Sequence, residues 1–140
     1  MKCDDRLIWV VLHHESLREQ MVDTVREIGC GKFRIVEFKT MEQALDELEN
    51  HPTSDDPDLI VAGQWLRSDF KDNPYSLLIN NSRLNPIPRL LILGPRLPHW
   101  LSREMSAFPK ENFLTIPFHI KELMSYIENL LEKAQMRASA

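Results

Sequence analysis

The stretch LIWVVLHHESLREQM, residues 7–21, decides the fold class. Leu7–Leu12 is a continuous apolar run, which is typical of a strand that is covered on both faces. The residues after it have helical spacing, and Ser16-x-x-Glu19 has the pattern of a capping box at a helix start. His13 and His14 lie between the two elements. In an open α/β sheet, this junction is where ligands and catalytic groups are bound.

The same alternation of apolar runs and helical periodicities continues to the end of the chain. The strand at 33–38 alternates in polarity, as an edge strand does, and Thr40-x-x-Gln43 forms a second capping box. Further strands are predicted at 59–63, 88–93 and 112–116, and further helices at 73–79, 97–108 and from Ile120 to Ala134. Strict alternation with short connections predicts an α/β fold, a five-stranded parallel sheet that is doubly wound by helices on both faces. We expect a single domain over residues 1–140, with a core of about 6–131 and a C-terminal tail of 132–140.

Composition and charge exclude several classes of protein. The 17 basic and 21 acidic residues give a net charge of −4 and form no basic block, so we expect no nucleic-acid partner. The apolar run Leu7–Leu12 is too short to span a membrane, so we expect no membrane partner. Cys3 and Cys30 do not have metal-ligand spacing, and without an export signal they are expected to be reduced thiols in the cytoplasm.

Four segments carry a resemblance to a known family: LIWVVLHHESLREQM, PDLIVAG, IPRLLIL and NFLTIPFHIKEL. The chain resembles the receiver domain of bacterial response regulators, which has a flavodoxin-like (βα)5 fold, from about Arg6 to Leu131. In that family these places read as a strand ending in an acidic pair, a strand ending in aspartate, a strand ending in Thr or Ser, and a strand ending in Lys-Pro-Phe.

The resemblance places the residues of receiver chemistry on side chains that lack the required groups. The acidic pair falls on His13 and His14, and the phospho-accepting aspartate falls on Gly63. The remaining degenerate positions are the hydroxyl position, on Leu93 or Gly94, and the lysine position, on Ile116. Pro117 and Phe118 keep the family's residues, and the resemblance implies a cis peptide bond before Pro117.

Each replacement removes a step of ordinary receiver chemistry. Gly63 has no carboxylate to attack phosphorus. Magnesium requires oxygen ligands, which the imidazoles of His13 and His14 do not supply. Ile116 cannot pair with a phosphoryl group. We therefore expect a pseudo-receiver that is not an enzyme and needs no cofactor.

The function that this resemblance implies is a phosphorylation-independent signalling module of a two-component-type regulatory system, which acts by protein–protein interaction. In the receiver family the fourth helix, fifth strand and fifth helix form the usual partner and dimer face. This implicates Trp100, Met105, Phe113 and the exposed side of 122–133, either for a signalling protein partner or for a homodimer. Trp65, in the loop after Gly63, is a further candidate because tryptophan is enriched at the centres of protein contacts.

An alternative is a small-ligand or metal sensor that uses a crevice lined by His13, His14, Gly63 and Trp65. The missing side chain at Gly63 enlarges that crevice. Against a metal, adjacent residues at a strand end usually point in different directions, and no third ligand beyond Glu15 is evident. We therefore expect no bound metal and favour the interaction module.

Overall fold

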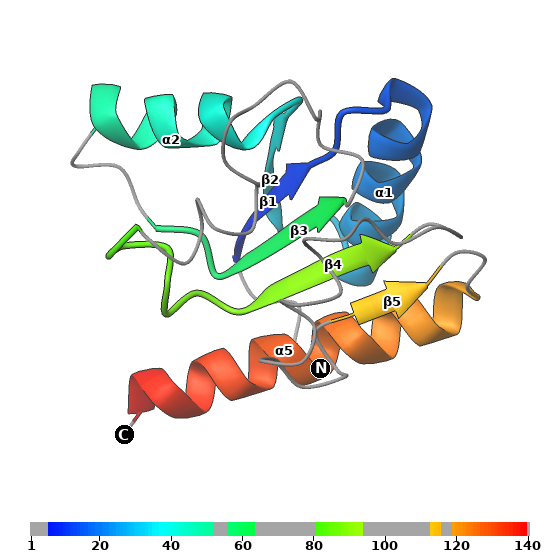
Figure 1. Cartoon of the computed structure of the whole chain (residues 1–140). Helices are drawn as coiled ribbons and strands as arrows, with labels where there is room; N and C mark the ends of the chain where they lie inside the picture. Colours follow the sequence, from blue (N-terminus) through cyan, green and yellow to red (C-terminus); the bar gives the residue numbers. More distant parts are fainter. Residues whose placement is uncertain (1–5, 52–55, 64–80, 94–112, 116–118, 140) are drawn as a thin grey trace.

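Five parallel strands form one sheet in the order β2-β1-β3-β4-β5 (Figure 1). This computed structural model describes residues 6–51, 56–63, 81–93, 113–115 and 119–139, with side chains of the last segment described as far as Glu132. The strands are β1 (Leu7–Val11), β2 (Arg34–Phe38), β3 (Leu59–Gly63), β4 (Arg89–Leu93) and β5 (Phe113–Thr115). The described helices are α1 (Glu15–Ile28), α2 (Met41–Asn50) and α5 (Ile120–Ser139). The predicted parallel α/β sheet is confirmed; the helices predicted at 73–79 and 97–108 lie outside the described residues.

Strand β1 lies inside the sheet, as its unbroken apolar run predicts. It pairs with β2 on one side and with β3 on the other, and all five of its residues are buried. Strand β2 lies at the edge, which confirms the prediction from its alternating polarity. Trp9 of β1 packs edge-on against Phe38 of β2, with ring centroids 5.1 Å apart.

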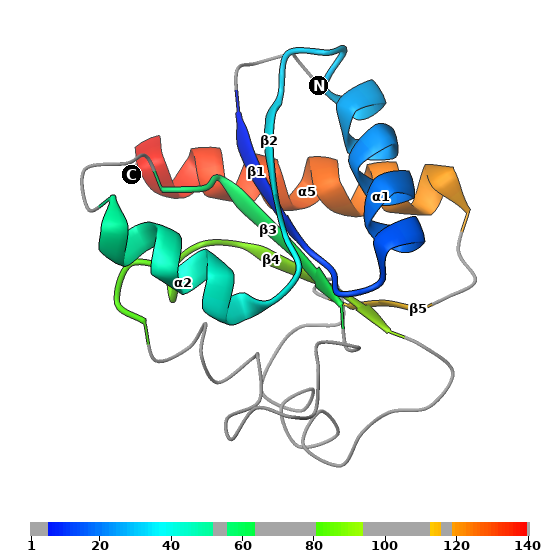
Figure 2. The same cartoon turned by 90° about the horizontal axis from the view of Figure 1, so that it is seen from above.

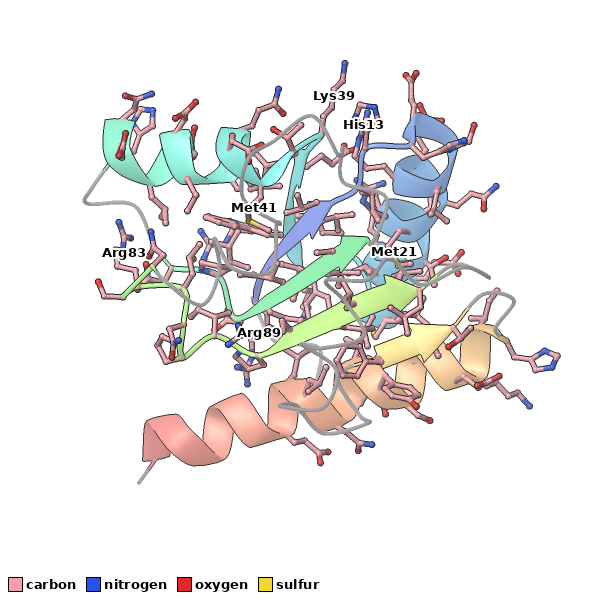
Figure 3. All side chains as sticks on the ribbon, viewed as in Figure 1. His13, Met21, Lys39, Met41, Arg83 and Arg89 are labelled. Atoms are coloured by element: carbon pink, nitrogen blue, oxygen red, sulfur yellow. The ribbon has the colours of Figure 1, made fainter. Side chains whose placement is uncertain are left out.

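The helices cover both faces of the sheet and form two separate cores. Helices α1 and α5 pack on the face that carries Ile8 and Val10 of β1. Helix α2 packs on the opposite face, which carries Trp9 and Val11 (Figure 2). In Figure 3, Met21 of α1 and Met41 of α2 point toward the sheet from these two layers. The arrangement is the doubly wound one that the alternation of elements predicts.

Helix α1 does not begin as the sequence predicts. The prediction of a capping box at Ser16 is wrong, because the helix already begins at Glu15. Its N-cap is His14, whose side chain makes no capping hydrogen bond. The helix ends at Gly29, which is its C-cap and whose N–H bonds to the carbonyl oxygen of Val25 at 3.1 Å. A Cβ at Gly29 would lie 2.3 Å from Cγ of Phe33, so the chain needs glycine for this close approach.

Helix α2 begins with the capping box that its sequence predicts. The Oγ1 of Thr40 accepts a hydrogen bond from the N–H of Gln43 at 3.2 Å. The Oε1 of Gln43 reaches back to the N–H of Lys39 at 2.9 Å. These two bonds satisfy backbone donors that the start of a helix otherwise leaves to water.

Helix α5, which confirms the helix predicted from Ile120, buries one apolar side against the sheet. Its buried members are Leu123, Ile127, Leu130 and Leu131. Ile120 is an exception, because it is 59% exposed at the first position of the helix. No helix among the described residues is long and apolar enough to cross a membrane.

Cys30 corrects the expectation of reduced thiols. It follows the C-cap of α1 with a positive φ of 55°, and it is disulfide-bonded. Cys3, the other cysteine of the sequence, lies outside the described residues. The argument for a reducing compartment from two free thiols therefore does not hold.

Candidate functional site

The carboxyl ends of the inner strands meet at one edge of the sheet, as parallel pairing requires. Val11 of β1 is level with Ala62 of β3, and Gly63 of β3 is level with Ile92 of β4. Leu93 of β4 is level with Thr115 of β5. The strand ends that the sequence analysis singled out are therefore neighbours, and we call this the carboxyl edge.

His13 and His14 lie just past this edge and are both exposed. The main chain stays paired up to Leu12, whose N–H bonds to the carbonyl oxygen of Phe38 at 3.1 Å. Beyond it, His13 points away from the sheet (Figure 3). Within the described part of the chain, no group of three His, Cys, Asp or Glu side chains is placed to hold a metal ion.

Gly63 and Leu93 are buried at the ends of their strands. The Leu93 side chain is 3% exposed and belongs to the core beneath α2, so it supplies a packing surface and no hydrogen-bonding group. The other predicted positions of receiver chemistry, Gly94, Ile116 and Pro117, lie outside the described residues.

Arg18 is a residue of this edge that the sequence analysis missed. It is 8% exposed on the inner side of α1. Its Nη1 donates to the carbonyl oxygen of Leu12 at 2.9 Å, and its Nε donates to Oε1 of Glu37 in β2 at 3.3 Å. A signal for it exists in the sequence, because position 18 shares the helical spacing of Met21 and Val25 and is charged where they are apolar.

The predicted partner face is described only in part. Phe113 is 8% exposed and packs in the core beneath α2, so little of its side chain is accessible to a partner in this structure. On α5 the outward side carries exposed polar residues, among them Glu122, Ser125, Asn129 and Glu132. Trp65, Trp100 and Met105 lie outside the described residues.

Comparison by sequence finds no counterpart for this chain. No protein-family profile matches it. No curated protein matches it either.

Comparison by structure finds receiver domains. The signal receiver domain of a putative LuxO repressor protein from Vibrio parahaemolyticus superposes with a TM-score of 0.72 at 17% identity, over 96% of each chain. The receiver domain of a sensor histidine kinase from Pseudomonas aeruginosa, solved with magnesium coordinated in its active-site cleft, gives 0.72 at 15% identity, over 92% of this chain and 99% of that one. The receiver domain of a histidine kinase from Syntrophus aciditrophicus gives 0.73 at 20% identity, over 91% of each. The chain therefore has the fold of signal receiver domains.

Proposed function

We propose that this protein is a phosphorylation-independent signalling module of a two-component-type system, a pseudo-receiver that acts by binding another protein. The observation that carries the proposal is Gly63. It ends β3 at the carboxyl edge, where the resemblance to receivers places the phospho-accepting aspartate. Glycine has no nucleophile, so the reaction that switches ordinary receivers has no acceptor at this position.

The residues of the β1–α1 junction support the same proposal. The Pseudomonas aeruginosa receiver domain holds magnesium in its active-site cleft. At the junction where the resemblance places the acidic pair, this chain has His13 and His14, both exposed. Magnesium prefers carboxylate and water oxygens, and neutral imidazole is a ligand for softer metals. Phosphoryl transfer in receivers needs the metal, and these side chains are poor ligands for it.

Without covalent switching, the output of such a domain comes from binding in one standing conformation or from a shift that the partner itself drives. We place the contact where the resemblance to receivers puts the usual partner face, on residues 97–108, β5 and α5, with Trp100 as its anchor. The occupant is a signalling protein or a second copy of the chain. In this proposal the protein is not an enzyme and uses no cofactor.

A phosphodonor experiment tests the loss of receiver chemistry. The protein is incubated with magnesium and acetyl phosphate and its intact mass is measured, and in parallel the amide resonance of Gly63 is followed during titration with beryllium fluoride. We expect neither a mass gain nor a saturable shift. A phosphorylatable receiver domain in the same buffers is the positive control.

Addition of one phosphoryl group would contradict the proposal. It would show that another carboxylate, such as Asp69 in the segment after Gly63, has become the acceptor. A saturable beryllium fluoride shift at Gly63 would likewise show that the edge still binds a phosphoryl analogue.

A further inference from the structure

Arg18 and Arg89 are the two buried charged residues in the described part of the chain, and Arg18 lies at the carboxyl edge. Burying a charge costs free energy unless hydrogen-bond partners compensate it. The partners of Arg18 therefore indicate its structural role. Its side chain is 10% exposed and reaches from the second turn of α1 back toward the sheet.

Arg18 binds both ends of the segment that contains the two histidines. At one end, its guanidinium donates to the carbonyl oxygen of Leu12 at 2.9 Å, in a buried position. At the other end, the backbone N–H of residue 18 donates to the carbonyl oxygen of His14 at 2.9 Å, which is the first i→i−4 bond of α1 and does not depend on the side chain. A third contact, 3.3 Å from Nε to the carboxylate of Glu37, joins α1 to β2.

In the described part of the chain, neither a side-chain cap nor packing of the two histidines fixes the turn between β1 and α1. The N-cap residue His14 makes no side-chain capping bond, and Ser16 lies inside the helix. His13 and His14 are exposed, so core packing does not hold their side chains. Leu12 is buried and its N–H bonds to Phe38, and within the described part of the chain the bond from the Arg18 guanidinium is the side-chain hydrogen bond that reaches residues 12–14.

We propose that Arg18 is a positioning residue that closes the His13–His14 turn and keeps the carboxyl edge in one standing conformation. The bond to Leu12 contributes more than the bond to Glu37. A charged donor on a buried carbonyl is stronger than an ion pair to a carboxylate that is 46% exposed. This inference does not depend on the proposed function.

Amide hydrogen exchange tests it with the variant Arg18→Met, which keeps the apolar stem and removes the guanidinium. Opening of the turn breaks the contacts of Arg18, so the amides of Leu12 and of residue 18 should exchange at least about tenfold faster. The amide of Gln43 in the cap of α2 should keep its wild-type rate.

Arg26→Met is the matched control. Arg26 lies on the same helix, its side chain is 57% exposed, and among the described residues it pairs with Asp23, three positions earlier, at 3.4 Å. We expect no change in exchange at Leu12. Glu37→Gln should raise exchange at Leu12 by less than about fivefold, because it leaves the bond to the carbonyl in place.

A wild-type exchange rate at Leu12 in Arg18→Met, together with a lower midpoint of urea unfolding, would overturn the proposal. That result would give Arg18 a global structural role that is not linked to the turn. If Arg18→Met cannot be purified folded, the wild-type protein supplies the test. The amides of Leu12 and Arg18 should then exchange through one common opening, with the same opening free energy and the same dependence on urea. Different opening free energies or urea dependences for the two amides would overturn the proposal.

Discussion

Gly63 is the residue on which the proposed function depends most directly, and placing a carboxylate there tests whether the rest of the carboxyl edge can support phosphoryl transfer. We expect Gly63→Asp to remain unphosphorylated by acetyl phosphate and magnesium, because the exposed imidazoles of His13 and His14 do not replace carboxylate ligands. Intact mass after incubation is the measurement.

The same position is buried, which gives this substitution a second expected effect. A carboxylate at residue 63 loses solvation, so Gly63→Asp should unfold at lower urea than Gly63→Asn, by about 1–3 kcal/mol in the free energy of unfolding. Gly63→Asn has nearly the same shape without the charge. Phosphorylation of Gly63→Asp would show that the edge retains a working metal site.

The roles of single residues were predicted less well from the sequence than the secondary structure was. Ser16 has the pattern of a cap, but α1 begins one residue earlier with His14 as its N-cap, and the guanidinium of Arg18 bonds to Leu12 across this turn, which a four-residue pattern cannot reveal. Ile120 has the right periodicity but is exposed, because periodicity identifies the face of a helix and not the extent of the sheet beneath it. The disulfide bond of Cys30 depends on the path of the folded chain.

At the scale of elements, the two capping patterns provide a matched comparison. Thr40→Ala removes the oxygen that accepts from the N–H of Gln43, so we expect a loss of about 1 kcal/mol in the free energy of unfolding. Ser16→Ala should have almost no effect, because Ser16 is an exposed position inside α1. Urea unfolding of both variants against wild type is the measurement.

Equal losses for the two variants would mean that Ser16 caps the helix in solution and that α1 begins later than Glu15. Equal neutrality would mean that the start of α2 is held by the packing of Met41, which is 1% exposed, and not by the cap.

Strands were more predictable than helix starts, because a strand that is buried on both faces has apolar residues at every position. Strand β1 is apolar at every position and proves to be buried at every position. Strand β2 mixes Arg34 and Glu37 with Ile35 and Val36, and it lies at the edge. The order of the strands in the sheet was not predicted, because an apolar composition does not identify which strands are neighbours.

At the scale of the whole molecule, the proposed function requires a surface that binds another protein, and Trp100 and Trp65 mark the two candidate surfaces. An interfacial tryptophan truncated to alanine typically costs 2 kcal/mol or more, which is about thirtyfold in affinity. We expect Trp100→Ala to weaken self-association or partner binding by that order, and Trp65→Ala to do less. Sedimentation velocity over a concentration series measures self-association, and circular dichroism checks that each variant is folded.

Two outcomes would contradict the assignment of the binding surface to Trp100. Unfolding of Trp100→Ala would make this tryptophan part of the core. Loss of binding in Trp65→Ala alone would place the contact at the carboxyl edge, beside Gly63, and would favour the ligand-crevice alternative.

The exposed edge at β2 has a consequence for the behaviour of the protein at high concentration. An unpaired strand edge is a template on which other chains can add strands and aggregate. Here the edge strand is five residues long, carries the exposed charges of Arg34 and Glu37, and is flanked by exposed Lys32 and Lys39. A second strand paired with it would desolvate these charges, and a second copy in parallel register would also bring like charges together. The same residues that mark β2 as an edge therefore keep the sheet from growing into fibres.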